Sequence, residues 1–319
     1  MNTFRRSLRW FFALAGFVLG LATAVSAYIA RTMIAPARQQ LTVTPQSKGL
    51  TFEDVEFPAQ DGLRVSGWFI PAAAETALSG PTIILAHGWQ WNRLGFEGNN
   101  LFANISGSEP VDLMRLIGDL NAGGYNVLAI DLRNHGESAT AHPVTFGQSE
   151  AKDLLGALEY LEDRDDIDMD RIGVMGFSIG ANAILFALPQ TAQIKAAIAV
   201  QPMTPSVFTR RFSDNLFGVF GALINAFSSF FYQLFGGPRL AGIIPAFAAA
   251  GSGDVPVLYV QGTGDEWGSV EDVSVMADMT PGTQQLLFVN SQHRFGGYSY
   301  ILDHPAVATR FFNEHLDPD

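Results

Sequence analysis

The sequence predicts an α/β protein with a mostly parallel sheet, helices on both faces and an inserted helical cap. Short strand-like runs alternate with helical segments through most of the chain. Several of these runs are apolar at every position, as in strands buried on both faces. The chain has 319 residues, 48% hydrophobic and only 16% charged, so it can bury a large core.

Charge and composition exclude some classes of protein. The net charge is −12, and the charged residues of positions 1–40 are all Arg, so the rest of the chain is more acidic still. Such a body lacks the basic surface that phosphate binding needs, and we expect no nucleic-acid partner. The chain has no Cys, which excludes disulfides, thiol nucleophiles and Cys-ligated zinc. We expect no metal site.

Residues 1–35 are predicted to be a membrane anchor or a signal segment. Residues 10–30 hold no charged side chain, and a helix of this length spans roughly 30 Å, the thickness of a bilayer core. Arg5, Arg6 and Arg9 precede the run and favour a cytoplasmic N-terminus. An uncleaved anchor is the main interpretation. A signal peptide cleaved after Val25-Ser26-Ala27, giving a secreted protein, is the alternative. Both place the body on the periplasmic or extracellular side.

Residues 36–50 are polar, include two Pro and are predicted to be a linker. The folded domain should therefore occupy residues 51–319. Its first two strands, 52–57 and 63–70, are joined through Asp61-Gly62, which is typical of a hairpin. Residues 82–86 form a continuous apolar run that ends at His87-Gly88 and suits a central strand.

The remaining elements follow in alternation. Apolar spacing predicts helices, and Gly123-Gly124 and Pro189 end two of them. Short apolar runs predict strands. The helices are expected at 111–120, 149–162, 181–188 and 305–316, and the strands at 125–130, 172–177, 196–200, 255–260 and 285–289.

Residues 206–250 interrupt the alternation. They are rich in Phe, and residues 216–235 contain no charged side chain. Hydropathy alone favours a second membrane span here. A span would force the next strand to return to the sheet across the bilayer, so we expect a helical cap at about 206–250 instead. A cap that also dips into a membrane surface is the alternative.

The segment Gly176-Phe177-Ser178-Ile179-Gly180 follows a predicted buried strand and opens a predicted helix. In this context Gly-x-Ser-x-Gly indicates a nucleophile elbow, a tight turn that raises the Ser178 hydroxyl above the sheet. A serine hydroxyl needs a base to take its proton. We expect His293, just past the last strand, rather than His304 or His315.

A carboxylate should orient the imidazole and follow the preceding strand. Asp265 has this position, with Glu266 and Asp272 as alternatives. The oxyanion of the intermediate needs two donors. We expect the backbone N–H of Ile179 and that of Trp89, with Gln90 second. Gln90, Trp91 and Phe177 adjoin these groups and are expected to line the substrate site.

Together these motifs resemble the α/β-hydrolase superfamily over about residues 50–316. The resemblance rests on His87-Gly88, the run from Asp131 to Ser138, Gly176–Gly180, Gly262–Asp265 and His293. It is greatest with capped serine hydrolases such as carboxylesterases and lipases. The resemblance implies eight strands, a cap after the sixth, no cofactor, and structural roles for His87 and His135. The family often has Val or Pro soon after the acid, where this chain has Trp267-Gly268.

The sequence therefore predicts a membrane-anchored serine hydrolase that cleaves carboxylic esters of apolar, small or lipid-like substrates through an acyl-enzyme. The uncharged, Phe-rich cap is the reason for expecting apolar substrates. An acyltransferase or a peptidase with the same triad is the first alternative, because both share the acyl-enzyme. A non-catalytic, membrane-bound binding protein on the same scaffold is the second.

Overall fold

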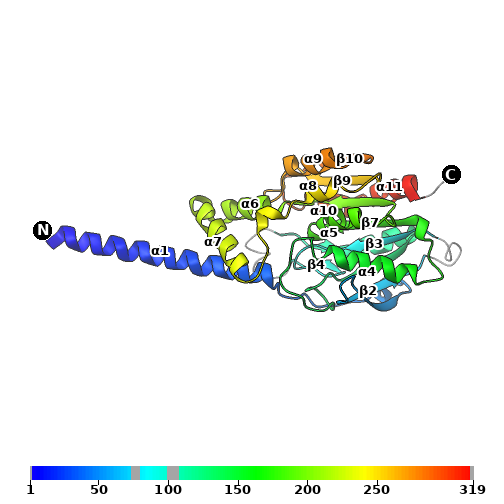
Figure 1. The fold of residues 1–319 in the computed structure, drawn as a ribbon, viewed down its shortest axis with the longest axis horizontal. Coiled ribbons are helices and arrows are strands. Elements are labelled where there is room, and N and C mark those ends of the chain that lie inside the picture. Colours follow the sequence, from blue (N-terminus) through cyan, green and yellow to red (C-terminus); the bar gives the residue numbers. More distant parts are fainter. Residues whose placement is uncertain (1, 73–79, 99–107, 317–319) are drawn as a thin grey trace.

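Figure 1 shows the computed structural model, which describes residues 2–72, 80–98 and 108–316. The long helix α1 (Asn2–Ile34) extends away from a rounded body that holds the sheet and its covering helices. Residues 99–107, part of the loop that follows Trp89, lie outside the described residues.

A mostly parallel, eight-stranded sheet forms the centre of the body, as the sequence predicted. Its strand order is β1-β2-β6-β3-β7-β8-β9-β10. β2 runs antiparallel to both of its neighbours, and all other neighbouring strands are parallel. The strands are β1 (Glu53–Pro58), β2 (Arg64–Ile70), β3 (Thr82–Ala86), β6 (Asn126–Ile130), β7 (Ile172–Phe177), β8 (Ala196–Val200), β9 (Val257–Gly262) and β10 (Gln284–Val289).

Helices cover both faces of this sheet. One apolar core lies under α4 (Ala151–Glu162), α5 (Ile179–Ala187), α8 (Pro245–Ala249) and α9 (Val270–Met279). The other lies under α3 (Leu113–Ala122), α10 (Gly296–Asp303) and α11 (Ala306–Leu316). The central strands β3, β6, β7 and β8 are buried along their whole length, which explains why they are apolar at nearly every position.

Shorter elements complete the body. β4 (Gly95–Phe96) and β5 (Val111–Asp112) form a two-stranded sheet, so the helix expected from residue 111 begins at Leu113. Asp112 caps it by accepting a hydrogen bond from the Arg115 backbone N–H. The short 3₁₀ helices are η1 (Pro45–Lys48), η2 (Met169–Arg171), η3 (Leu188–Gln190), η4 (Gly218–Phe220) and η5 (Leu240–Gly242).

Residues between β8 and β9 form a helical hairpin. α6 (Pro205–Phe217) and α7 (Gly221–Leu234) are joined by η4, and Gly218 has a φ of 52° at the break. α7 folds back on α6 so closely that a Cβ on Gly221 would lie 2.6 Å from the Asp214 Cα. Residues Pro205–Leu234 are long and apolar enough to cross a membrane by composition. Each helix alone is about 20 Å long, too short for a bilayer core of about 30 Å.

The C-terminal part of α1 is packed into the body. Ala30, Met33 and Ile34 are buried with Tyr232 of α7 and Ile243. The Ser26 hydroxyl donates a hydrogen bond of 3.3 Å to the Ile224 carbonyl of α7. α1 and α7 lie side by side in Figure 1. Helix α1 is therefore both an extended apolar helix and a structural part of the domain.

The segment predicted as a linker is tied to the body. Arg38 donates to the carbonyls of Gly136 and Ser138 at 2.7 and 2.6 Å. The Gln39 amide donates to the Gly95 carbonyl at 3.0 Å and accepts from the Glu97 N–H at 3.1 Å. These bonds use backbone groups of distant loops as partners, so residues 36–50 do not form a free spacer in this structure.

Candidate active site

Ser178 lies at the turn between β7 and α5, at the carboxyl end of the sheet. Its φ is 52° and its ψ is −111°, a strained conformation for a residue with a side chain. The Ser178 N–H donates to the Val200 carbonyl at 2.9 Å, which ties the turn to neighbouring β8. Ser178 lines the pocket described below.

The two glycines of the motif make this turn sterically possible. A Cβ on Gly176 would lie 2.5 Å from the Gly180 carbonyl carbon. A Cβ on Gly180 would lie 2.6 Å from the Ala86 carbonyl oxygen and 2.7 Å from that of His87. All of these contacts are with backbone, which cannot move aside cheaply. The local sequence is therefore the one that a nucleophile elbow requires.

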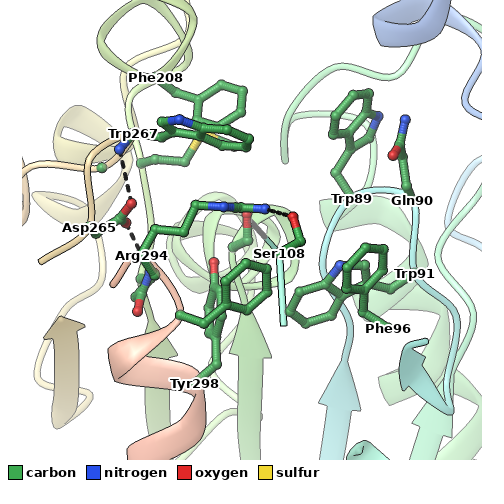
Figure 2. A pocket seen from close by; sticks show the side chains of 15 residues that line it. Trp89, Gln90, Trp91, Phe96, Ser108, Phe208, Asp265, Trp267, Arg294 and Tyr298 are labelled. Atoms are coloured by element: carbon green, nitrogen blue, oxygen red, sulfur yellow. Dashed lines mark hydrogen bonds between the residues drawn. The ribbon is translucent and has the colours of Figure 1, made fainter. Parts of the chain in front are cut away.

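Ser178 lines a small pocket in which seven of the fifteen lining residues are aromatic. The lining includes Asp265 and two of the expected substrate-site residues, Gln90 and Trp91. In Figure 2, Trp89 and Gln90 lie on one side of the pocket, and Phe208 and Trp267 on the other. Phe177 is fully buried behind this pocket, where it packs on Trp91 and Tyr298.

Asp265 follows β9 and is held by three donors. The amides of Gln201 and Gln261 donate to its Oδ2 at 2.9 and 3.2 Å, and the Trp267 N–H donates to its Oδ1 at 3.0 Å. The alternative acids lie elsewhere. Asp272 accepts from the Thr204 hydroxyl and N–H at 2.7 Å, and Glu266 accepts from Asn215 at 2.9 Å.

The structure places the His293 side chain outside the pocket. Its Nδ1 lies 3.6 Å from Oε2 of Glu109, and the side chain is 45% exposed. The His293 backbone, however, lies beside the acid: a Cβ on Gly264 would be 2.7 Å from the His293 nitrogen. The geometry thus brings Ser178 and Asp265 to one pocket, and brings the main chain of His293, but not its ring, to the same edge of the sheet.

Arg294 fills the middle of the pocket instead. Figure 2 shows its side chain crossing from the Asp265 side to Ser108, with which it forms a hydrogen bond. The guanidinium lies 3.7 Å from the ring centre of Trp267 and 4.1 Å from that of Phe295. Burial lowers the pKa of Arg294 to about 10, partly offset by Tyr298 and Asp265. It therefore remains a cation at neutral pH.

Two further groups were not anticipated from the sequence. Tyr298 of α10 lines the same pocket as Ser178, and burial raises the pKa of Tyr298 well above its usual range. Gln201, with a φ of 48°, bonds Asp265, the Arg294 carbonyl and the Gly297 N–H. A polar residue directly after the buried strand β8 was the available signal for Gln201.

The predicted oxyanion donors lie on the turns around Ser178. Ile179 begins α5, so its N–H is at a helix N-terminus, where negative charge is favoured. Gly88, Trp89 and Gln90 form a tight turn after β3, closed by the Trp91 N–H donating to the Gly88 carbonyl at 3.2 Å. Gln90 has a φ of 64° in this turn. A Cβ on Gly88 would lie 2.9 Å from the Trp91 ring.

His87 and His135, unlike His293, are buried and have structural partners. His87 Nδ1 lies 2.7 Å from the Gly88 carbonyl, and its Nε2 accepts from the Leu132 N–H at 3.0 Å. Burial lowers the pKa of His87 to about 4. His135 Nδ1 lies 2.8 Å from the Arg133 carbonyl, and burial lowers its pKa to about 3. Both rings are neutral, as structural roles require.

No cluster of three or more His, Asp or Glu side chains that could hold a metal ion occurs within the described residues.

Comparison with known proteins identifies the class. Residues 83–309 match the model of the alpha/beta hydrolase family, and the chain belongs to this family. An esterase from Pyrococcus furiosus has a similar structure, with a TM-score of 0.67 and 23% identity over 89% of this chain and 99% of that chain. An acylaminoacyl peptidase from Pyrococcus horikoshii has a TM-score of 0.59 and 18% identity over 85% of this chain and 43% of that one.

Curated relatives match over shorter segments. The uncharacterized protein YfhR of Escherichia coli O157:H7 is 33% identical over 141 residues, which cover 43% of this chain and 42% of that protein. The alpha/beta hydrolase domain-containing protein WAV2 of Arabidopsis thaliana is 28% identical over 174 residues, 53% of this chain and 50% of that protein. The match therefore spans half or less of the length of these relatives.

Proposed function

We propose that the protein is a serine hydrolase that cleaves carboxylic esters of apolar substrates through an acyl-enzyme on Ser178. The observation that carries the proposal is the strained elbow, which presents the Ser178 hydroxyl to a pocket that also contains Asp265. The surrounding aromatic side chains favour an apolar acyl or alcohol group. Membership of a hydrolase family supports the reaction class.

In the proposed reaction the Ser178 oxygen forms a bond to the ester carbonyl carbon while the base takes its proton. The backbone N–H groups of Ile179 and Trp89 stabilise the resulting oxyanion. The carbon–oxygen bond to the alcohol then breaks, and the base returns the proton to the departing alcohol. Water repeats the same steps on the acyl-enzyme and releases the carboxylic acid and free Ser178.

His293 is the proposed base and Asp265 its orienting acid. Support comes from the backbone contact of His293 with Gly264, one residue before Asp265. In the reacting state the imidazole must leave Glu109 and turn inward, and Arg294, which now lies between Trp267 and Phe295, must give way. Apo active sites often have catalytic hydrogen bonds that tighten only when substrate binds.

A fluorophosphonate probe tests the nucleophile directly. We expect the folded protein to be labelled at Ser178, and the Ser178→Ala variant to be neither labelled nor able to hydrolyse short p-nitrophenyl esters. Esterase activity of that variant at the wild-type rate would refute the proposal. Absence of labelling in wild-type protein would favour the non-catalytic alternative. Competition between water and an added alcohol, followed by product analysis, separates hydrolysis from acyl transfer.

We also propose that α1 is an uncleaved membrane anchor, with the domain on the periplasmic or extracellular side. Arg9–Ile34 is long and apolar enough to cross a membrane. Its last turns supply core residues, and the segment after it is bonded to the body through Arg38 and Gln39. Cleavage after Ala27 would separate Ser26 from its bond to Ile224. N-terminal sequencing of the membrane-extracted protein tests this, because an intact N-terminus is expected.

A further inference from the structure

A second cavity adjoins the Ser178 pocket. It lies between α1, α6 and α7 and has a volume of about 290 Å³, near the lower end of the ~300–1,000 Å³ usual for small-molecule sites. Trp89, Gln90 and Phe208 line both this cavity and the Ser178 pocket. The two spaces are therefore neighbours that share one wall, on the side of the expected oxyanion turn.

The walls of this cavity are suited to a hydrocarbon chain. None of the described residues that line it is charged. α1 contributes Val25, Ile29 and Met33, and α6 contributes Phe212 and Leu216. Two lining threonines return their hydroxyls to their own helices, where Thr32 donates to the Ile29 carbonyl and Thr209 to that of Ser206. Because these two hydroxyls already donate to acceptors in their own helices, they do not need a polar ligand as a partner.

The position of the cavity along α1 relates it to a bilayer. About 20 residues of helix span a bilayer core, so a span that starts at Trp10 reaches Ile29. Within this stretch the aromatic side chains Trp10 and Phe17 are 66% and 69% exposed. The α6–α7 hairpin also exposes Val219, Phe220 and Phe230. The cavity wall formed by Val25 and Ile29 thus falls at the last turns of the span, at the level where a bilayer meets the domain.

We infer that the cavity between α1, α6 and α7 binds the acyl chain of a long-chain carboxylic ester that enters from a lipid bilayer, so that the membrane helix is one wall of the substrate site. The inference rests on the proposed function, because the ester carbonyl must reach Ser178 past Trp89 and Gln90. The cavity is uncharged, shares a wall with the Ser178 pocket and lies at the level of the membrane surface. These three features favour an acyl chain as the occupant.

Chain-length selectivity tests the inference. The full-length protein is reconstituted in phosphatidylcholine vesicles, and kcat/KM is measured for p-nitrophenyl esters from acetyl to decanoyl. Val25→Trp fills the cavity from α1, and Ser229→Phe fills it from α7. Each should lower the ratio of decanoyl to acetyl kcat/KM about tenfold or more. The matched control is Leu21→Trp, one turn earlier on α1 and 56% exposed, which should leave the ratio unchanged.

The source of the substrate is tested in the same vesicles. If the decanoyl ester enters from the bilayer, its rate should follow the mole fraction of ester in the lipid and fall when plain lipid is added at constant bulk concentration. A rate that follows only the bulk concentration would overturn entry from the bilayer. An unchanged chain-length ratio in both cavity-filling variants would overturn the acyl site itself.

Photo-cross-linking separates this inference from the proposed function. A fatty acid with a diazirine near its methyl end should label α1 and α6 in wild-type protein, and Val25→Trp should abolish the labelling while Leu21→Trp should not. This readout needs no catalysis. Labelling of α1 and α6 without esterase activity would retain the acyl site and refute the hydrolase proposal. Esterase activity with labelling elsewhere would retain the hydrolase proposal and refute the acyl site.

Discussion

Tyr298 of α10 and Ser178 at the tip of the elbow line the same pocket. The pocket thus joins the turn after strand β7 to the helix that follows β10, so two segments far apart in the sequence meet at Ser178. Because burial raises the pKa of Tyr298 well above its usual range, the phenol stays protonated at neutral pH. We therefore propose that Tyr298 is a neutral hydroxyl group that positions the Ser178 side chain in the reacting state.

Replacing this tyrosine should slow the reaction more than it weakens substrate binding. Tyr298→Phe removes the hydroxyl that would bond Ser178, and such a bond contributes about 1 kcal/mol, so we expect kcat for a short ester to fall about fivefold with little change in KM. Tyr300→Phe is the control, since Tyr300 is on the same helix and stacks on His304. Steady-state kinetics on both variants check this. Equal kcat values for Tyr298→Phe and wild type would contradict the positioning role.

His293 and Glu109 should respond to mutation in opposite ways. His293→Ala removes the proposed base, and we expect kcat to fall by about 10³-fold or more. Glu109→Gln weakens the contact that holds the imidazole outside the pocket, so activity should be retained or increased. His304→Ala should have no effect. Loss of activity in Glu109→Gln together with full activity in His293→Ala would refute this assignment.

A methyl group at the elbow should be far more harmful than one on α3. Gly180→Ala places a Cβ 2.6 Å from the Ala86 carbonyl oxygen, so we expect loss of ester hydrolysis and a lower Tm. Gly118→Ala is the matched control. It lies within α3 with nothing within 4 Å of its Cβ position, and it should stabilise the fold by about 0.5–1 kcal/mol. Thermal unfolding and activity assays compare the two.

Burial of neutral His87 should make stability depend on pH. The pKa of His87 is about 4 in the folded state, below the ordinary value of 6.5, so the unfolded chain binds a proton first as pH falls. Stability should therefore decrease between about pH 6.5 and pH 4, by at most about 1.4 kcal/mol per pH unit from this group. In His87→Gln the slope should be shallower. Urea unfolding at several pH values measures it, and identical slopes would contradict the prediction.

Most of the sheet could be predicted, because a strand that is buried on both faces is a short apolar run in its own sequence. β3, β7 and β8 are fully buried and apolar, and their observed bounds agree with the expected runs. α9 was not anticipated, although Ser269 caps it by accepting from the Asp272 N–H. α10 was also missed, since it opens with two glycines, which are poor helix formers. α9 packs against α8, β9 and β10, and α10 packs against β9, β10 and β5, so both helices owe their stability to tertiary packing.

The site was only partly predictable, because the positions of its side chains depend on tertiary contacts. Ser178 and Asp265 follow buried strands, so their place at one edge of the sheet follows from topology. The direction in which a loop side chain points does not follow from topology. Adjacent residues His293 and Arg294 point to opposite sides, and the aromatic partners that hold Arg294 inside, Trp267 and Phe295, come from two different loops. Such long-range stacking leaves no periodic pattern in a sequence.

The bonds that Arg38 makes to the Gly136 and Ser138 carbonyls have a mechanical consequence. A tethered enzyme on a flexible stalk can tumble and sample many heights and tilts above the lipid. If α1 is the proposed anchor, this chain has no such freedom, because residues directly after the helix are hydrogen-bonded to the domain. The height and tilt of the Ser178 pocket above a bilayer would then be set by the fold itself, and lengthening the chain at residue 36 would uncouple the pocket from the anchor.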